Sequence, residues 1–369
     1  MKKILIVFGT RPEAIKMAPL VKELYKHIEF ATKVCVTAQH REMLDQVLSF
    51  FKITPDYDLN LMKANQSLNE LSSRILTAID TVLIEFKPDF VLVHGDTSTS
   101  SMVALASFHR NIKVGHVEAG LRTYNKLAPF PEEINRQITG CLADFHFAPT
   151  KQSAQNLLNE GVNTNSIFIT GNTVIDALFW GINNINKKRK DINEIASFIN
   201  NEKKLIVVTG HRRENFGDKF YEFCSALKEL ANRKDVQLIY PVHLNPNVQK
   251  VVYETLGQHS NIKLIAPLDY EAFIWLLNQS FLIITDSGGV QEEAPSLKKP
   301  VLVTREVTER QEAVEEGTVK LVGTNKEKIL EEASLLLDDK TVYANMIGNA
   351  NPYGNGTAAK QIVKALKLF

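Results

Sequence analysis

The sequence predicts an α/β protein built from two Rossmann-like, doubly wound domains that face a central cleft. Short β-branched runs alternate with longer stretches of helical period, which is typical of doubly wound folds. Most of these runs are continuously apolar, as in parallel strands that are buried on both faces. The series occurs twice in 369 residues, a length that suits about two domains.

The expected elements follow that order along the chain. In a first domain, 1–170, strands are predicted at 4–8, 33–37, 90–94, 113–117, 145–148 and 167–170. In a second domain, 171–356, they are predicted at 205–209, 236–241, 262–265, 281–285, 301–304 and 319–322. Helical stripes lie between the strands, for example Leu68, Leu71, Ile75, Ile79 and Val82. A last helix, 357–369, follows a Pro/Gly break and is expected to pack back on the first domain.

Composition narrows the partners that we expect. Lys and Arg number 43 against 42 Asp and Glu, a balance that argues against a nucleic-acid partner. The one dense basic cluster, 187–190, is interpreted as a solvated turn.

Cys35, Cys141 and Cys224 form no paired motif and are predicted to be buried free thiols in a reducing compartment. The first apolar run is too short for a signal peptide and no run reaches membrane-span length, so a cytoplasmic protein without a membrane partner is expected.

The first strand is followed by a loop, Gly9–Lys16, that contains two cations. Pro12 fits the first turn of a helix, so Arg11 and Lys16 lie around a helix N-terminus, where free N–H groups favour anions. A phosphate clamp is the favoured interpretation, and a plain turn with solvated cations is the alternative. The loop is neither a Walker loop nor a dinucleotide fingerprint.

Carboxylates follow the next strands of the first domain. Asp96 comes after 90–94, Glu118 directly after 113–117, and Glu132 and Glu133 shortly afterwards. A carboxylate at the end of a buried strand is costly unless it is paired or functional. Acids whose pKa values are pushed apart can perform acid–base catalysis. For any single acid a helix N-cap is the alternative, but the set favours catalysis.

The second domain contains a stretch that resembles a phosphate nest. Ser287, Gly288 and Gly289 follow a strand and precede a helix, so small residues allow a close backbone approach. Glu292 or Glu293 is placed to accept from ribose hydroxyls, and Arg305 or Arg310 to meet a phosphate or carboxylate. A plain tight turn is the alternative. The nine histidines show no metal-ligand spacing, so no metal is expected.

These residues, taken together, closely resemble the non-hydrolysing UDP-N-acetylglucosamine 2-epimerases of bacteria. The resemblance covers nearly the whole chain in order, and its motifs are 8–16, 94–97, 115–123, 131–136, 171–176, 210–215 and 285–293. It implies a glycosyltransferase-B type of fold, a homodimer, and a UDP-sugar substrate. The implied reaction converts UDP-N-acetylglucosamine reversibly to UDP-N-acetylmannosamine for cell-surface polysaccharide precursors, by elimination and re-addition of UDP. No nicotinamide, metal or other cofactor is implied.

The resemblance also carries residue roles to this sequence. It implies catalytic roles for Asp96, Glu118, Glu132 and His211. It implies substrate contacts for Arg11, Lys16, Phe273, Ser287, Gly288, Gly289, Glu293 and Arg310. Gln39, Arg212 and His243 resemble part of a second, regulatory substrate site.

This sequence departs from the family pattern at several positions. Leu268 stands where some relatives carry glutamine, Gln311 where proline is common, and Asn65 where regulated members carry arginine, so regulation stays open. Three other functions stay open as well: a hydrolysing 2-epimerase that releases N-acetylmannosamine, a glycosyltransferase of the same fold, and a sugar-nucleotide sensor.

Overall fold

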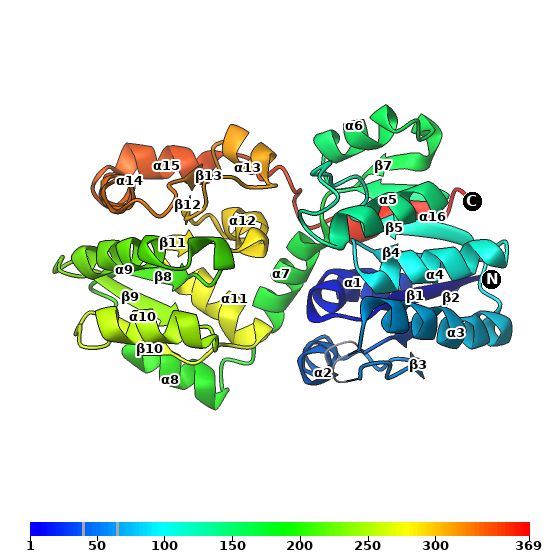
Figure 1. The fold of residues 1–369 in the computed structure, drawn as a ribbon, viewed down its shortest axis with the longest axis horizontal. Helices are drawn as coiled ribbons and strands as arrows, with labels where there is room; N and C mark the ends of the chain where they lie inside the picture. The colour runs from blue at the N-terminus through cyan, green and yellow to red at the C-terminus, as the bar shows by residue number, and fades with distance from the viewer. Residues whose placement is uncertain (39–40, 64–65) are drawn as a thin grey trace. The chain divides into compact units, whose positions relative to one another are not determined.

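The computed structural model describes residues 1–38, 41–63 and 66–369, and the chain divides into two compact units. Unit 1 comprises Met1–Trp180 and Tyr353–Phe369, and unit 2 comprises Gly181–Pro352 (Figure 1). The expected boundaries at 170/171 and 356/357 therefore differ from those of the structure. The reason is that Trp180 packs in unit 1, against Phe50 and Phe51, with ring centroids 5.5 and 4.8 Å away.

Unit 1 is built on a parallel sheet whose strands run in the order β3-β2-β1-β4-β5-β6-β7 among the described residues. The strands are β1 (Lys2–Phe8), β2 (Phe30–Val36), β3 (Tyr57–Asp58), β4 (Phe90–His94), β5 (Lys113–Val117), β6 (Phe145–Ala148) and β7 (Ile167–Ile169). The six strands predicted for this domain are confirmed within a few residues, whereas the two-residue β3 was not predicted.

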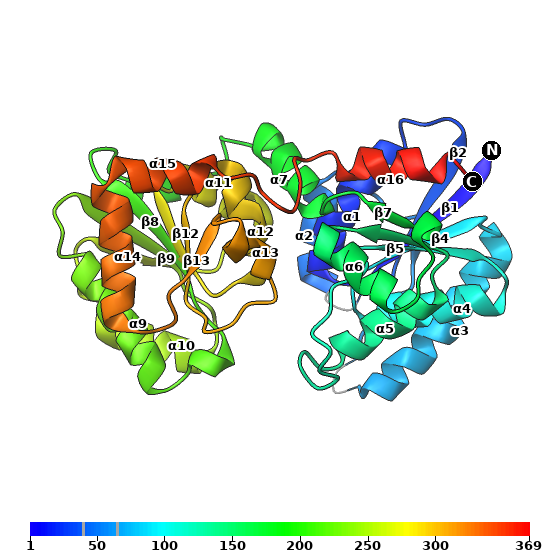
Figure 2. The ribbon, with the colours of Figure 1, turned by 90° about the horizontal axis from the view of Figure 1, so that it is seen from above.

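Helices cover both faces of this sheet (Figure 2). They are α1 (Arg11–Leu24), α2 (Arg41–Phe50), α3 (Leu68–Phe86), α4 (Ser98–His109), α5 (Glu132–Leu142), α6 (Lys151–Asn159) and α16 (Ala358–Leu366). α1 contacts α2 and α16, and α4 contacts α3 and α5. Asp176, in α7 (Thr173–Asn184), accepts the backbone N–H groups of Ala358 and Ala359 at 3.1 and 3.0 Å and so fixes the start of α16.

Unit 2 repeats the same plan on a second parallel sheet, in the order β10-β9-β8-β11-β12-β13. The strands are β8 (Lys204–Thr209), β9 (Val236–Pro241), β10 (Ile262–Ile265), β11 (Leu282–Thr285), β12 (Val301–Val303) and β13 (Val319–Leu321). The helices are α8 (Lys190–Phe198), α9 (Asp218–Leu230), α10 (Pro246–Leu256), α11 (Tyr270–Gln279), α12 (Gly288–Glu293), α13 (Gln311–Glu315), α14 (Lys326–Asp338) and α15 (Lys340–Gly348).

The strand order decides where each unit can hold a ligand. Both sheets run outward in two directions from a central pair, β1 and β4 in unit 1 and β8 and β11 in unit 2. In open α/β sheets, ligands bind beyond the carboxyl ends of the strands at this switch point. The loops that were singled out from the sequence follow β1, β4 and β5 in unit 1 and β8 and β11 in unit 2.

Two expectations about surface residues need correction. Cys35 and Cys224 are buried free thiols, but Cys141 is exposed, because α5 buries Thr139 and Gly140 and turns the next residue outward. Arg189 does not lie in a purely solvated turn.

Instead, the Arg189 guanidinium is paired with three carboxylates. It contacts Asp191, Asp269 and Glu271 at 2.5, 2.6 and 2.7 Å.

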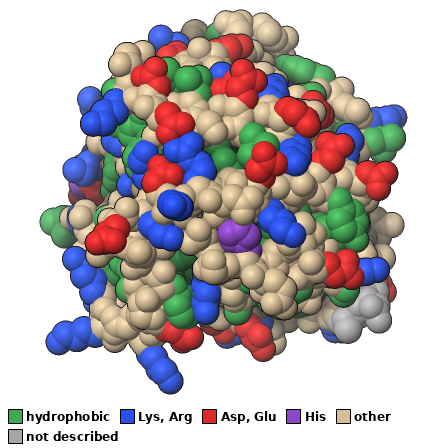
Figure 3. Space-filling model, turned by 90° about the vertical axis from the view of Figure 1, so that its left-hand side faces the viewer, with side chains coloured by type: hydrophobic (Ala, Val, Ile, Leu, Met, Phe, Trp, Pro, Cys, Tyr) green, Lys and Arg blue, Asp and Glu red, His purple; other side chains and the backbone are tan. Residues whose placement is uncertain are grey.

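On the face that Figure 3 shows, basic and acidic side chains are interspersed. None of the helices in the described part of the chain has both the length and the apolar character needed to span a bilayer.

Candidate active site

Two carboxylates lie at the carboxyl ends of neighbouring strands of unit 1, as predicted. Asp96 follows β4 and Glu118 follows β5, and the register pairs His94 with Val117 at the last position of these strands. The Gly95 N–H donates to the Val117 carbonyl at 2.9 Å, which fixes the first loop against the second strand. The sheet therefore places both acids at one edge.

The Glu118 carboxylate lies within a cluster of donors. Lys16 of α1 forms an ion pair with its Oε2, and the Asn172 Nδ2 donates to the same oxygen at 2.7 Å. The His94 Nε2 lies 3.7 Å from it. The side chains of Lys16 and Glu118 are only 12% and 9% exposed, so water screens this pair weakly. Lys16, which was predicted to clamp phosphate, is in this structure the partner of a carboxylate.

Asp96 and Glu132 have different surroundings. The Arg136 Nη2 donates to the Asp96 Oδ2 at 2.6 Å, and its Nη1 donates to Glu133 at 3.4 Å. Glu132 is the first residue of α5, and within the described part of the chain its side chain forms no hydrogen bond or ion pair. Glu133 is fully buried and accepts the backbone N–H groups of Thr123 and Tyr124 at 3.0 and 3.1 Å. Glu133 thus holds the backbone of the loop that precedes α5.

The loop after β1 is held by Glu13, which sequence reasoning did not assign to the site. Its Oε2 accepts the N–H groups of Gly9 and Thr10 at 3.0 and 2.8 Å, and its Oε1 accepts the Thr97 hydroxyl at 2.8 Å. Burial raises the pKa of the Glu13 carboxyl to about 7, although these hydrogen bonds act against the shift. Thr10 and Thr97 are the N-caps of α1 and α4, so Glu13 joins the starts of both helices. Arg11, half-buried, is the first residue of α1.

Two histidines beneath these loops are neutral. His116 of β5 and His146 of β6 are paired in register and fully buried. Burial lowers the pKa of His116 to about 3 and that of His146 to about 4. The His116 Nε2 lies 2.7 Å from the Gly95 carbonyl, and because the ring is neutral this nitrogen carries the proton and donates. His116 of β5 therefore holds the Gly95–Asp96 peptide in place by this hydrogen bond.

In unit 2, Asp286 organises the loop after β8. Its carboxylate is fully buried and accepts the backbone N–H groups of His211 and Arg212 at 2.7 and 2.8 Å. The His211 ring stacks on His243 at 4.9 Å, and its Nδ1 lies 3.6 Å from Asp286. Burial lowers the pKa of His211 and outweighs the opposing effect of Asp286. His211 is thus oriented and mainly neutral near pH 7.

The loop after β11 ends a strand and begins α12, as predicted. A Cβ on Gly288 would lie 2.8 Å from the Arg310 Cζ, whereas a Cβ on Gly289 would meet no atom within 4 Å. The Arg310 Nε and Nη2 contact the buried Glu292 Oε1 at 3.0 and 2.9 Å. Glu292 therefore holds Arg310 against the glycine loop.

The remaining candidates of unit 2 lie on α11 and α12. Glu293 is buried and accepts the Tyr270 hydroxyl at 3.2 Å. Phe273 of α11 is half-buried, one turn further along the helix from Tyr270. Of the regulatory candidates, Arg212 and His243 follow β8 and β9, and Gln39 lies outside the described residues.

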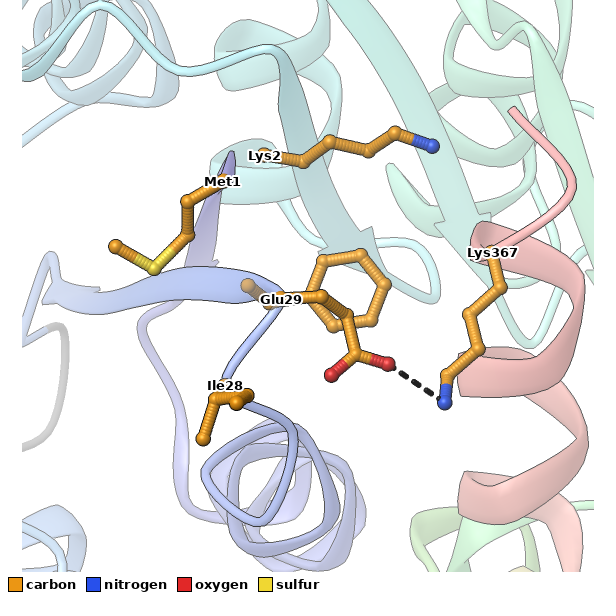
Figure 4. A pocket seen from close by; sticks show the side chains of 6 residues that line it. Met1, Lys2, Ile28, Glu29 and Lys367 are labelled. Atoms are coloured by element: carbon orange, nitrogen blue, oxygen red, sulfur yellow. Dashed lines mark ion pairs between the residues drawn. The ribbon is translucent and has the colours of Figure 1, made fainter.

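A pocket of unit 1 lies at the opposite, amino end of the sheet (Figure 4). It is lined by Met1, Lys2, Ile28, Glu29, Phe30 and Lys367, and includes none of the predicted site residues. The Lys367 Nζ pairs with Glu29 at 2.7 Å. Within the described residues, no group of His, Cys, Asp and Glu side chains is arranged to hold a metal ion.

Four residues that organise these loops lie within the motifs of the resemblance but were given no role from the sequence: Glu13, Arg136, Asn172 and Asp286. Only Glu13 had a usable local signal, because Thr10-x-x-Glu13 has the spacing of a capping box. The contacts of the other three with Asp96, Glu118 and His211 span 40, 54 and 75 positions, and no local pattern encodes them.

Known proteins resemble this chain over its whole length. A family model described as UDP-N-acetylglucosamine 2-epimerase matches residues 22–367. A protein named UDP-N-acetylglucosamine 2-epimerase from Campylobacter jejuni is 58% identical over 372 residues, which cover 99% of this chain and 97% of that protein. The crystal structure of UDP-GlcNAc 2-epimerase from Neisseria meningitidis bound to UDP-GlcNAc matches at 50% identity with a TM-score of 0.91 and covers 100% of both chains.

A co-structure of S. aureus MnaA with UDP is similar as well. It matches at 50% identity with a TM-score of 0.87 and covers 100% of this chain and 96% of that one. The family model and the identity of these relatives over nearly the whole chain show that this chain belongs to the UDP-N-acetylglucosamine 2-epimerase family.

Proposed function

We propose that this protein is a non-hydrolysing epimerase that interconverts UDP-N-acetylglucosamine and UDP-N-acetylmannosamine. Family membership supports the reaction, and a 50% identical relative has been crystallised with UDP-GlcNAc. The observation that carries the proposal is the pair Asp96 and Glu118, set on neighbouring strand ends, with Glu132 on the helix that follows.

In unit 1 the carboxylates act on the sugar. One carboxylate takes the C2 proton, the C2–H electron pair forms a C1=C2 double bond, and UDP leaves with the electrons of the C1–O bond. UDP oxygen then attacks C1, and the double-bond electrons take a proton at C2 from a second carboxylic acid on the other face, which becomes a carboxylate. The residue types suit this reaction, since carboxylates serve as general acids and bases, and Lys16 and Arg136 pair with two of them, Glu118 and Asp96.

In unit 2 the loops after β8 and β11 bind UDP. Backbone N–H groups of the Ser287–Gly289 loop, the His211 ring and Arg310 stabilise the charge that develops on the diphosphate. Glu293 accepts from the ribose and Phe273 contacts the uracil side. Arg11 of unit 1 adds a cation for the substrate. His243 stacks on His211, and Arg212 follows His211 in the chain, so the two regulatory candidates lie beside the proposed diphosphate site.

The proposal includes the compartment and the oligomeric state of the enzyme. Free Cys35, Cys141 and Cys224 suit a reducing compartment, so we place the enzyme in the cytoplasm. We place it there as a homodimer. Ile84 and Phe108, on the contacting helices α3 and α4, are 51% and 58% exposed and offer apolar surface to a second copy.

Product analysis tests the reaction and separates it from the alternatives. With UDP-N-acetylglucosamine alone, the proposal predicts a mixture of two UDP-sugars that is also reached from UDP-N-acetylmannosamine. Free N-acetylmannosamine with stoichiometric UDP would instead identify a hydrolysing enzyme. Turnover only with an added acceptor would identify a glycosyltransferase, and binding without turnover a sensor.

The open space at Gly289 gives a prediction about UDP binding. Gly289→Ala is expected to leave the melting temperature unchanged, because the new Cβ meets no atom of the folded chain within 4 Å. The methyl group would hinder the approach of the diphosphate and weaken UDP binding about tenfold or more, which calorimetry can measure. Gly348→Ala, at an equally open position at the end of α15, is the control. Equal UDP affinity of wild type and Gly289→Ala would remove the glycine loop from the UDP site.

A further inference from the structure

Asn172 lies where three segments of unit 1 meet. Its backbone N–H donates to the Tyr353 carbonyl at 2.8 Å, in the segment by which the chain re-enters unit 1. Its side-chain Nδ2 donates to the Glu118 Oε2 at 2.7 Å. The residue is 3% exposed, so water cannot easily substitute for either hydrogen bond.

The orientation of the Asn172 amide follows from its other contact. Its Oδ1 accepts the Val174 N–H at 3.0 Å, at the start of α7. An amide oxygen only accepts and an amide nitrogen only donates, so a flipped amide would set two donors against each other at Val174. The start of α7 therefore directs the N–H of Asn172 to Glu118.

Glu118 needs such support because its backbone is strained. It has a φ of 64°, in the left-handed region, without being glycine. Such a conformation is unfavourable for a residue with a side chain and persists only where the surroundings hold it. Lys16 from α1, His94 from β4 and Asn172 all approach Oε2 of this residue. The Asn172 amide carries no charge, so it holds the carboxylate by the direction of its N–H rather than by ionic attraction.

We propose that Asn172 is a positioning residue that orients the Glu118 carboxylate for proton transfer and ties it to the returning segment at Tyr353. This inference rests on the proposed epimerase function, in which Glu118 is one of the acting acids. The N–H donor also favours the anionic carboxylate, together with Lys16. In this proposal Asn172 affects the reaction through Glu118.

Two substitutions separate this role from the capping of α7. Asn172→Asp retains an oxygen for the Val174 N–H but sets a second carboxylate against Glu118. Asn172→Ser retains a capping hydroxyl that is too short to reach Glu118. We expect kcat to fall about 10- to 100-fold in both variants, while KM for UDP-N-acetylglucosamine changes less than about twofold. The low-pH limb of kcat/KM should move to higher pH in Asn172→Ser, since the carboxylate is then protonated more easily.

Asn163→Asp is the matched control, because Asn163 caps a short helix of unit 1 by the same kind of hydrogen bond, to the Asn165 N–H at 2.9 Å. It should keep wild-type kcat and pH profile. A wild-type kcat in either Asn172 variant, or a rise in KM with kcat unchanged, would overturn the positioning role while leaving the epimerase function intact. Absence of epimerisation by the wild-type protein would overturn the proposed function and this inference with it.

Discussion

Glu118→Gln is expected to lower kcat by about 10³-fold while the protein stays folded. General acid–base groups contribute about 10²–10⁴-fold, and an amide of the same size can neither take nor return the C2 proton. Asn172 and Lys16 would then contact a neutral oxygen, which preserves the shape of the cluster but not its charge. Steady-state rates of UDP-sugar interconversion measure the effect, and circular dichroism checks the fold.

Glu23→Gln provides the matched control for this variant. Glu23 lies on α1, the helix that carries Lys16, and pairs at 2.7 Å with Lys26, whose side chain is 64% exposed. The same chemical change there should leave kcat within about twofold, because Glu23 does not belong to the strand-end loops of the site and a pair with an exposed lysine contributes little. If Glu118→Gln retained more than a tenth of wild-type kcat, Glu118 would not be an acting acid.

Glu13→Gln is expected to remove a pH dependence of stability. The pKa of Glu13 is about 7 in the folded protein against an ordinary value of 4.5, so the folded state holds its proton more tightly than the unfolded chain does. In the wild type, the contribution of Glu13 to the free energy of unfolding is therefore greatest below about pH 4.5 and is lost as the pH rises to about 7. The shift corresponds to about 3 kcal/mol across that window. A neutral glutamine does not titrate, so the variant should gain stability relative to wild type as the pH rises.

Urea unfolding of both proteins at pH 4.5, 6 and 7.5 measures this difference, because other titrating groups cancel between them. Glu70→Gln is the control, since Glu70 forms the same capping box at the exposed start of α3. The hydrogen bonds of Ser67 lower the pKa of Glu70, so its contribution is lost only as the pH falls below about 4.5. Parallel curves for wild type and Glu13→Gln between pH 4.5 and 7.5 would show that Glu13 does not hold a proton in the fold.

Much of the fold was predictable because it depends on local patterns. Continuous apolar runs located β4, β5, β9 and β10 at their observed bounds, since strands buried on both faces leave a clear signal. The two-residue β3 was missed because its sequence, Tyr57-Asp58, carries no such run. Trp180 was assigned to the wrong domain for a similar reason: its ring packs on Phe50 and Phe51, far away in the sequence.

The candidate site, like the fold, has parts that local sequence patterns reveal and parts that depend on contacts between distant residues. Asp96, Glu118 and the Ser287–Gly289 loop stood out because polar or small residues directly follow buried strands. The residues that orient these groups did not stand out in the sequence. Arg136, Asn172 and Asp286 act through contacts that form only when the parallel sheets bring distant strand ends together. Sequence patterns located the candidate residues of the site, and the structure was needed to find the residues that hold them in place.

The central claim, that carboxylates of this chain exchange the C2 proton of a UDP-sugar, is tested most directly in deuterated water. Wild-type protein would be incubated with UDP-N-acetylglucosamine, and both UDP-sugars would be examined by mass spectrometry and proton NMR. The account predicts one deuterium at C2 of UDP-N-acetylmannosamine, and its gradual appearance in UDP-N-acetylglucosamine as the reaction reverses. UDP-N-acetylmannosamine that formed without deuterium at C2, or no exchange and no product, would contradict it.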